Sequence, residues 1–408
     1  MSLDYDPRYP SIDDLRDRAR RRIPRFAFEY LDGGCNEDVN LHRNTSDIRN
    51  IELMPQYLSE HIRSNMTTEL FGHRYDAPFG ISPIGLQGLM WPATPEILAQ
   101  AAVDHNIPFC LSTVSTASIE TIGKITDGKF WFQLYHPAEE SVRDDILDRA
   151  EAAGCKTLVI LCDVPTFGYR PRDIRNGLAM PPSMSLRNIL QILGRPVWAM
   201  ETLRKGQPNF ETLRKYMPAS LNLKQLGQFM DKTFSGRLNE EKIKPIRDRW
   251  KGNLVLKGVA NPADADAAVR LGLDGIIISN HGGRQLDAGP SSVRSLEYIA
   301  DDFRDKLTII MDSGIRSGPD IARVLAMGAH FTMLGRTFMY GTAALGRRGG
   351  HHTIAILKRQ LQQVMEQICC QEVADFPNHL SRGTGHAVPS GGNSGALEPH
   401  PVVETIGS

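Results

Sequence analysis

The segment Ile277–Asp287 holds the residues whose types and spacing point most clearly to chemistry. Its apolar start is typical of a strand buried on both faces of a parallel sheet, and Gly282 and Gly283 permit a turn directly after it. His281 can titrate near neutral pH, and the guanidinium group of Arg284 can bind a carboxylate through two parallel hydrogen bonds. Together they predict a site that holds a carboxylate while removing a proton beside it. The alternative is a glycine-rich loop with a surface histidine.

Two later strand ends combine glycine with arginine. One apolar segment ends in Asp312, Gly314 and Arg316, and the next ends in Gly335 and Arg336. Glycines at strand ends expose backbone N–H groups, and the two arginines add charge-assisted contacts. In a barrel, the loops after the seventh and eighth strands are the common phosphate position, so this pattern predicts a phosphate site. Arginines on a solvated rim are the alternative.

Elements that could position these side chains are visible as eight short apolar segments, most of them followed by helical periodicity. The segments are 77–85, 107–113, 129–135, 157–164, 253–259, 275–280, 307–313 and 330–336. Eight strand–helix units of this length predict a TIM (β/α)8 barrel, with the functional residues at the carboxyl ends of the strands. A doubly wound sheet is the alternative, but no GxGxxG turn follows the first strand.

Three regions lie outside the regular repeat. Residues 1–50 contain two amphipathic stretches and are predicted to form an N-terminal helical segment before a barrel domain of residues 51–380. The connection after the fourth strand is too long for a simple loop, and residues 182–238 are predicted to be an insertion over the barrel mouth. Residues 381–408 are rich in Gly, Ser and Pro, and we expect a disordered tail or one wrapped on a partner.

Composition narrows the function classes. Forty-seven basic and 47 acidic residues balance, so nothing in the charge points to a nucleic-acid partner. The N-terminus lacks an apolar stretch and no run of eighteen apolar residues exists, which predicts a cytoplasmic protein without a secretory signal or membrane span. The six cysteines have no CxxC spacing, so we expect reduced thiols and no metal site; they are Cys35, Cys110, Cys155, Cys162, Cys369 and Cys370.

The string from Ile277 to Asp287 resembles the active-site signature of the FMN-dependent 2-hydroxy acid dehydrogenases and oxidases. This family includes bacterial lactate and mandelate dehydrogenases and glycolate oxidase. The resemblance covers residues 11–180 and 240–370. It implies an FMN-binding barrel that oxidises an L-2-hydroxy acid to the 2-keto acid, and we expect a homotetramer.

The resemblance also implies roles for individual residues. His281 matches the catalytic base, Asp163 its carboxylate partner, and Tyr135 a phenol that contacts the substrate hydroxyl. Arg284, Arg170 and Tyr30 match groups that bind the substrate carboxylate. The matches to flavin contacts are Pro83, Ile84, Gly85, Ser112, Gln133, Lys257, Ser279, Asp312, Gly314, Arg316, Gly335 and Arg336. From the residues alone, Asp163 could instead cap the next segment, and either tyrosine could be a packing residue.

Lys257 ends a buried apolar strand, where an unpaired ammonium group would be costly. We expect its partner to be the reduced flavin, which is anionic. Leu161 stands where many relatives have a threonine, so one polar flavin contact is absent. Val114 replaces the tryptophan of the short-chain glycolate oxidases, which predicts a substrate that is lactate-like or larger. Gly85 stands where oxygen-using members tend to have alanine, which favours transfer of electrons to a quinone or another carrier.

Several alternatives stay open. The chain could be an oxidase that produces hydrogen peroxide, an FMN-dependent isomerase on the same barrel, or a silent flavoprotein that serves as a scaffold. The insertion could be a mobile flap over the site, a packing element, or a peripheral contact with the inner face of the membrane. For the membrane alternative, Trp198, Met200 and Leu203 have the spacing of an apolar helical face beside Arg204 and Lys205.

Overall fold

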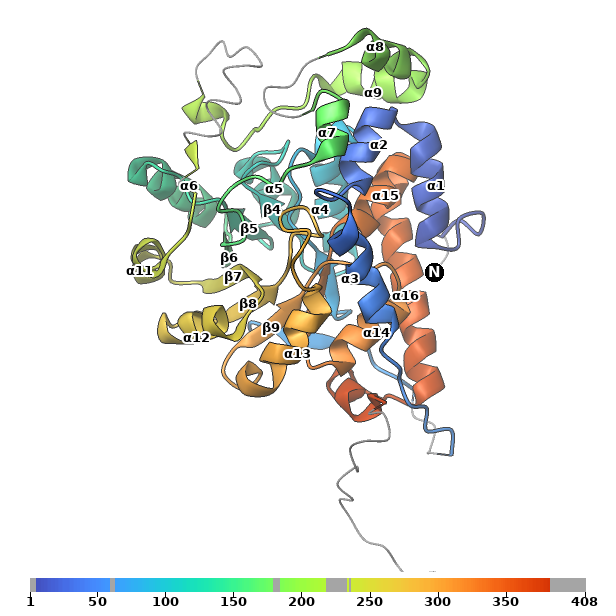
Figure 1. The fold of residues 1–408 in the computed structure, drawn as a ribbon, viewed down its shortest axis with the longest axis vertical. Helices are drawn as coiled ribbons and strands as arrows, with labels where there is room; N and C mark the ends of the chain where they lie inside the picture. The colour runs from blue at the N-terminus through green and yellow to red at the C-terminus, as the bar shows by residue number, and fades with distance from the viewer. Residues whose placement is uncertain (1–4, 59–62, 179–183, 218–232, 235, 382–408) are drawn as a thin grey trace, which may run out of the picture.

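The computed structural model describes residues 5–58, 63–178, 184–217, 233–234 and 236–381. Eight parallel strands follow one another in the order β3-β10-β9-β8-β7-β6-β5-β4, and a bridge between Ile81 and Phe109 joins the two ends of the sheet. The predicted TIM barrel is therefore confirmed, and the doubly wound alternative is wrong. Each predicted apolar segment contains one strand (Figure 1): β3 (Phe79–Ile81), β4 (Cys110–Ser112), β5 (Trp131–Leu134), β6 (Thr157–Leu161), β7 (Asn253–Val259), β8 (Gly275–Ile278), β9 (Thr308–Met311) and β10 (Phe331–Leu334).

A short antiparallel hairpin that the sequence pattern did not predict closes one end of the barrel. It consists of β1 (Thr68–Leu70) and β2 (His73–Tyr75). Its Leu70, Phe71 and Tyr75 pack against the side chains that fill the barrel interior. Phe71 also lies near Gly275, the first residue of β8, so the hairpin covers the end at which the strands begin. The opposite end, where the strands finish, stays available for a site.

The helices that follow the strands surround the barrel. Several begin where the sequence places a start signal: Asn261 caps α12 through its side chain, and proline occupies the first turn of α4 and α14. The remaining helix boundaries follow the expected strand–helix alternation. The helices are α4 (Thr94–Asp104), α5 (Ile119–Thr126), α6 (Glu140–Ala152), α12 (Pro262–Arg270), α13 (Ser292–Phe303), α14 (Gly318–Ala326), α15 (Arg336–Leu345) and α16 (Gly349–Ile368).

The N-terminal segment forms three helices that pack on the barrel. They are α1 (Ile12–Arg22), α2 (Arg25–Asp32) and α3 (Val39–Arg49), and α1 lies alongside α15 (Figure 1). A capping box formed by Ser11 and Asp14 starts α1. The carboxyl end of α2 reaches the end of the barrel at which the strands finish, because its last backbone carbonyls accept hydrogen bonds from arginines of the strand-end loops.

The long connection between β6 and β7 contains α7 (Pro171–Arg175), α8 (Leu186–Leu193), α9 (Pro196–Lys205), the 3-10 helix η2 (Arg214–Tyr216) and α11 (Glu240–Arg249). Residues 179–183, 218–232 and 235 of this connection, and residues 382–408 of the predicted tail, lie outside the described residues. Among the described residues, no helix is long and apolar enough to cross a membrane.

Of the apolar face expected on α9, Met200 and Leu203 are exposed but Trp198 is not. Trp198 is buried, because its ring packs edge-on against Phe26 and its indole N–H donates to the carbonyl of Met90 at 3.0 Å. Met200 and Leu203 are exposed, and they belong to a different surface that α9 shares with α8. The exposed apolar residues of this α8–α9 surface are Met184, Leu186, Ile189, Leu190, Leu193, Val197, Met200 and Leu203.

Candidate active site

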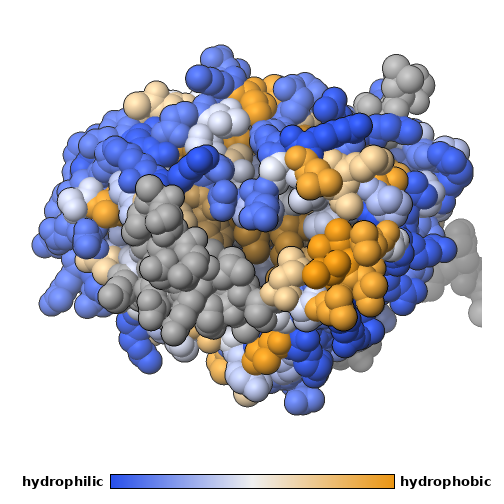
Figure 2. Space-filling model, turned by 90° about the horizontal axis from the view of Figure 1, so that it is seen from above, coloured by the Kyte–Doolittle hydropathy of each residue, from blue (hydrophilic) through white to orange (hydrophobic). Residues whose placement is uncertain are grey.

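A cavity of about 530 Å³ lies at the end of the barrel where the strands finish. Figure 2 looks onto the molecule from this side and shows a hollow with hydrophobic residues inside it. Of the eighteen residues to which the resemblance gives a site role, fourteen line it: Tyr30, Pro83, Ile84, Gly85, Tyr135, Arg170, Lys257, His281, Arg284, Asp312, Gly314, Arg316, Gly335 and Arg336. Four others do not line it, namely Ser112, Gln133, Asp163 and Ser279.

The loop after β8 holds His281 in a constrained backbone. His281, Gly282 and Gly283 have φ angles of 57°, 67° and 71°, so three successive residues are left-handed. Glycine is required at the second and third positions, because a Cβ would lie 2.4 Å from Nη1 of Arg336 or 2.5 Å from the backbone nitrogen of Leu41. The loop conformation therefore fixes where the imidazole points.

The imidazole of His281 faces the carboxylate of Asp163. The distance from Nδ1 to Oδ1 is 3.4 Å, and the pKa of His281 lies below its usual value because burial outweighs the attraction of Asp163. Oδ2 of Asp163 is buried without a hydrogen-bond partner among the described residues. A histidine that is neutral at pH 7 and backed by a carboxylate can accept a proton and stabilise the resulting charge.

Two arginines reach the cavity beside this pair. Nη1 of Arg284 donates to the backbone carbonyls of Tyr30 and Gly33 at 2.6 and 3.0 Å, and its guanidinium carbon lies 4.8 Å from the centre of the Tyr30 ring. Arg170 donates through Nη2 to Oε1 of Gln285 at 3.1 Å. Burial and the charge of Arg284 lower the pKa of Arg170 to about 10. Two guanidinium groups placed in this way can bind a carboxylate.

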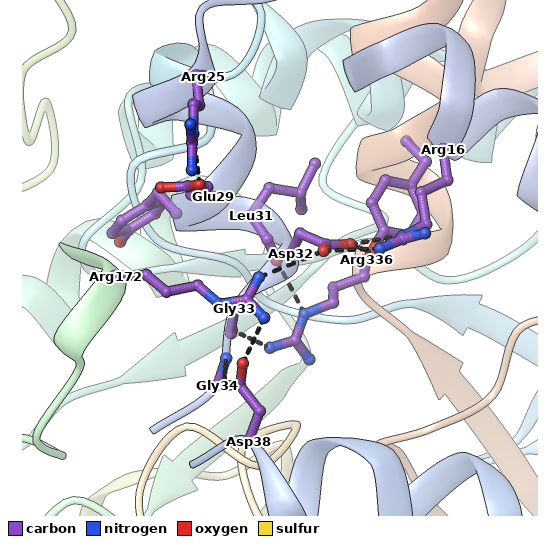
Figure 3. A network of polar contacts seen from close by, with 12 residues as sticks. Arg16, Arg25, Glu29, Leu31, Asp32, Gly33, Gly34, Asp38, Arg172 and Arg336 are labelled. Carbon is purple, nitrogen blue, oxygen red and sulfur yellow. Dashed lines mark hydrogen bonds and ion pairs between the residues drawn. The ribbon is translucent and has the colours of Figure 1, made fainter. Parts of the chain in front are cut away.

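The end of α2 anchors the Arg284 loop and also Arg336, whose contacts with this end are drawn in Figure 3. Arg336 donates from Nε to the carbonyl of Leu31 at 2.9 Å, from Nη1 to that of Gly282 at 2.8 Å, and from Nη2 to that of Gly33 at 2.7 Å. Burial lowers its pKa to about 9. In this structure, Arg336 therefore joins the N-terminal segment to the His281 loop, and its expected contact with a phosphate stays a prediction.

Ion pairs hold the end of α2 in place. Asp32 accepts from Nε and Nη2 of Arg16 at 2.6 and 2.8 Å and from the hydroxyl of Tyr340 at 2.7 Å. Arg172 of α7 pairs with Asp32 at 3.5 Å and also with Asp38 (Figure 3). This network links α1, α2, α7 and α15, so the carbonyl groups that bind Arg284 and Arg336 sit on a rigid support.

Lys257 has a partner within the protein that the sequence analysis did not foresee, and its expected contact with the reduced flavin stays a prediction. Its Nζ lies 2.8 Å from Oδ2 of Asp312 and donates to Oγ of Ser279 at 2.7 Å. Asp312 also accepts from the hydroxyl of Ser313 at 2.8 Å. Although burial opposes both charges, the pair keeps the pKa of Asp312 below and that of Lys257 above their usual values.

Apolar residues form the rest of the cavity wall. The ring of Phe234 lies 5.2 Å from that of Tyr135, and burial raises the pKa of Tyr135 well above its usual value. Val114, Ile174, Leu178, Phe210 and Phe234 all line the cavity.

Phe210 and Phe234 belong to the insertion predicted to lie over the barrel mouth, but neither residue was singled out and no periodic pattern marks them. Asp173 was also missed. The sequence signal for Asp173 is the spacing Arg170-x-x-Asp173. This signal is weak, because an acidic residue at such a position is more often an ordinary residue in the first turn of a helix.

Ser112, Gln133 and Ser279 are buried at strand ends below the cavity surface. Ser112 and Gln133 are paired between β4 and β5, and Oγ of Ser279 also accepts from the backbone N–H of His281 at 3.1 Å. Arg316 lines the cavity, donates from Nη1 to the carbonyl of Ile315 at 3.0 Å, and its backbone N–H donates to Asp320. Contacts of these residues with a flavin stay predictions.

Comparison with known proteins agrees with this geometry. The family model described as FMN-dependent dehydrogenase matches residues 19–382. An L-lactate dehydrogenase of Haemophilus influenzae (strain PittEE) is 40% identical over 367 residues, which cover 90% of this chain and 96% of that protein.

Two solved structures have the same fold. A monotopic membrane protein, (S)-mandelate dehydrogenase, superimposes with a TM-score of 0.85 at 32% identity, over 93% of this chain and all of that one. A soluble mutant of the membrane-associated (S)-mandelate dehydrogenase from Pseudomonas putida gives a TM-score of 0.77 at 32% identity, over 91% of this chain and 99% of that one. The chain belongs to the FMN-dependent dehydrogenase family.

Proposed function

We propose that the protein uses FMN to oxidise an L-2-hydroxy acid, lactate-like or larger, to the 2-keto acid. The observation that carries this proposal is the arrangement of His281 beside two arginines at one cavity, with Asp163 against the histidine. A base next to a site for a carboxylate fits a substrate that carries its reacting carbon beside a carboxyl group. The names of the relatives, lactate and mandelate dehydrogenases, support the same substrate class.

Each side chain has a distinct task in this proposal. Arg284 and Arg170 bind the substrate carboxylate, and Tyr30 and Tyr135 complete the polar contacts. Because Nδ1 of His281 faces Asp163, a proton on Nδ1 leaves the lone pair on Nε2, which removes a proton from the substrate carbon or its hydroxyl. Asp163 then stabilises the charged imidazole. Both proton positions are compatible with this placement of the base.

The cavity suits FMN in size and chemistry. Its volume of about 530 Å³ is typical of a cofactor site, and Gly85 and Gly335 present bare backbone at the ends of β3 and β10. Gly314, Arg316, Gly335 and Arg336 would hold the phosphate. Lys257, with Pro83, Ile84 and Gly85, would lie against the ring system. When bound, FMN supplies the two-electron acceptor that amino-acid side chains lack.

The size of the substrate follows from the apolar wall. Val114 leaves space that a larger aromatic residue would fill, and Phe210, Phe234 and Leu178 extend the apolar surface away from the arginines. Anaerobic mixing of the purified protein with L-lactate, L-mandelate and glycolate tests the proposal through bleaching of the flavin absorbance. Lactate or mandelate should reduce the flavin faster than glycolate. Absence of reduction by all three would reject the function, and a preference for glycolate would reject the size argument.

We propose a quinone or another carrier as the electron acceptor, on the basis of Gly85. An oxidase that produces hydrogen peroxide is the second candidate. Turnover with a quinone or dye should exceed turnover with oxygen in air. Stoichiometric peroxide formation at the dye-linked rate would favour the oxidase. An isomerase, or a silent scaffold, would show no net reduction of the flavin by any 2-hydroxy acid.

We further propose a cytoplasmic protein, assembled as a homotetramer, that touches the inner face of the membrane through the α8–α9 surface. This surface exposes eight apolar side chains beside the mouth of the cavity, where Figure 2 shows a hydrophobic patch. Exposed patches of this kind mark interaction sites, and one structural relative is described as a monotopic membrane protein. Arg204 and Lys205 at the end of α9 would contact anionic headgroups.

Flotation with anionic vesicles tests the membrane contact. The wild-type protein should float with the vesicles. Leu190→Glu together with Leu193→Glu should abolish this flotation. Tyr298→Glu, which places one negative charge on an exposed position of α13 away from this surface, is the control and should float normally. Equal flotation of the double variant, or none by the wild type, would reject the contact.

A further inference from the structure

Asp173 is a buried carboxylate that faces the two arginines of the proposed substrate site. It lies in the first turn of α7, lines the cavity and is 7% exposed. Its Oδ2 is 3.5 Å from Nη2 of Arg284 and 3.9 Å from Nη1 of Arg170. One oxygen atom therefore stands within ion-pair distance of both guanidinium groups.

These distances are longer than those of tight charge-assisted hydrogen bonds, which are near 2.8 Å. Asp173 therefore offsets part of the positive charge of the two arginines without forming a tight hydrogen bond to either. They are also buried close together, and burial, together with the charge of Arg284, lowers the pKa of Arg170. A second carboxylate that enters the cavity would meet both attraction from the arginines and repulsion from Asp173.

We infer that Asp173 is the resident counter-ion of the arginine pair, which holds Arg284 and Arg170 ready while the site is empty and limits the affinity for carboxylate ligands. It acts through the arginines and is a positioning residue. This inference rests on the proposed function, because it takes the substrate carboxylate to bind Arg284 and Arg170.

The effect of pH on ligand binding follows from the surroundings of Asp173. Burial raises its pKa above the usual value, although nearby guanidinium groups oppose this. As the pH falls through that pKa, Asp173 loses its charge and carboxylate ligands should bind more tightly. Protonation of His281, which lines the same cavity, should also tighten the binding of carboxylate ligands as the pH falls. The charged groups that act on Asp173 are Arg284 from the loop after β8, Arg170 just before α7, Arg172 within α7, and Arg336 from α15.

The test measures binding of pyruvate and of its neutral amide, pyruvamide, to the oxidised flavin-loaded protein, by the change in flavin absorbance and by calorimetry. Asp173→Asn keeps the shape and an acceptor oxygen but removes the charge. We expect pyruvate to bind about tenfold more tightly to this variant, because one like charge a few ångströms away is removed. Pyruvamide should bind as it does to the wild type.

Two further variants separate charge from packing. Asp173→Glu keeps the charge and should retain the acid-dependent gain in pyruvate affinity, whereas Asp173→Asn should lose that part of the pH profile and keep only the part due to His281. Asp145→Asn removes the carboxylate of an ion pair between α6 and Lys215, outside the cavity lining and outside the network that holds α2. It should leave pyruvate affinity unchanged.

Unchanged or weaker binding of pyruvate to Asp173→Asn would overturn the inference, as would an equal change for pyruvamide, because both indicate a merely structural role. Failure of the wild type to bind pyruvate at all would overturn both the inference and the carboxylate site. If the wild type binds pyruvate with this dependence on Asp173 but no 2-hydroxy acid reduces its flavin, the proposed function fails and the counter-ion role stands.

Discussion

Replacement of Lys257 by methionine isolates the contribution of the buried ion pair in the wall of the cavity. Lys257 and Asp312 are 2.8 Å apart, and their side chains are only 4% and 8% exposed. With an effective dielectric constant of about 20, their Coulomb attraction is about 6 kcal/mol, most of which offsets the loss of hydration. Lys257→Met leaves the Asp312 carboxylate buried without its cation, which should lower the free energy of unfolding by about 3–5 kcal/mol at neutral pH.

The dependence of this loss on pH gives a second check. In the wild type, the pair holds the pKa of Asp312 below its unfolded value, so its stabilisation is present at neutral pH and is lost as the pH falls through the folded pKa. In Lys257→Met, burial dominates and the folded pKa of Asp312 rises. The difference between variant and wild type should therefore shrink as the pH falls from 7 toward about 4.

Urea unfolding of the flavin-free and flavin-saturated forms measures the loss and separates it from altered flavin binding. Lys205→Met is the matched control. Lys205 pairs with Glu96 at a similar distance of 2.7 Å, but it is 52% exposed, and its loss should cost less than about 1 kcal/mol. A loss below about 1 kcal/mol for Lys257→Met, or a loss that does not change with pH, would refute the reasoning.

Three further predictions concern the cavity. His281→Asn, chosen because asparagine tolerates the left-handed backbone at this position, should retain FMN but slow flavin reduction by about two to four orders of magnitude in stopped-flow absorbance; wild-type activity should rise with pH through the lowered pKa of His281, since the neutral form is the base. Arg284→Lys should raise KM about ten- to a hundredfold, because lysine cannot bind the carbonyls of α2 and a carboxylate together; an unchanged KM would contradict this. Gly85→Ala should reduce dye-linked turnover, since its Cβ would lie 2.8 Å from Cγ2 of Val114, and Val114→Ala in the same chain should restore it.

The barrel was predictable because its signals are local. Each strand is a short apolar run, and most helices begin at a recognisable cap or proline. The hairpin β1–β2 was not predictable in this way. Its strands have three residues each, and the polar residues His73 and Arg74 interrupt the apolar pattern by which a buried strand is recognised.

The candidate site was predictable where a motif carried it and not where contacts join distant residues. His281 and Arg284 lie in one string, and the structure brings them to the cavity with Arg170 and Tyr135. The pairing of Lys257 with Asp312 arises only because β7 and β9 both flank β8, which no local pattern encodes. Asp173 lies close to Arg170 in sequence, but its other partner, Arg284, is 111 residues away, so no local pattern predicts that contact.

The anchoring of Arg284 and Arg336 on the end of α2 also bears on how the chain matures. Arg284 binds the carbonyl of Tyr30 across 254 residues, and Arg336 binds that of Leu31 across 305 residues. During synthesis, the N-terminal helices emerge first but find these partners only after nearly the whole barrel has been made. Contacts of such long sequence separation form slowly. We therefore expect completion of the cavity, and with it stable flavin retention, to be a late event of folding, in which the first helices made are among the last to dock.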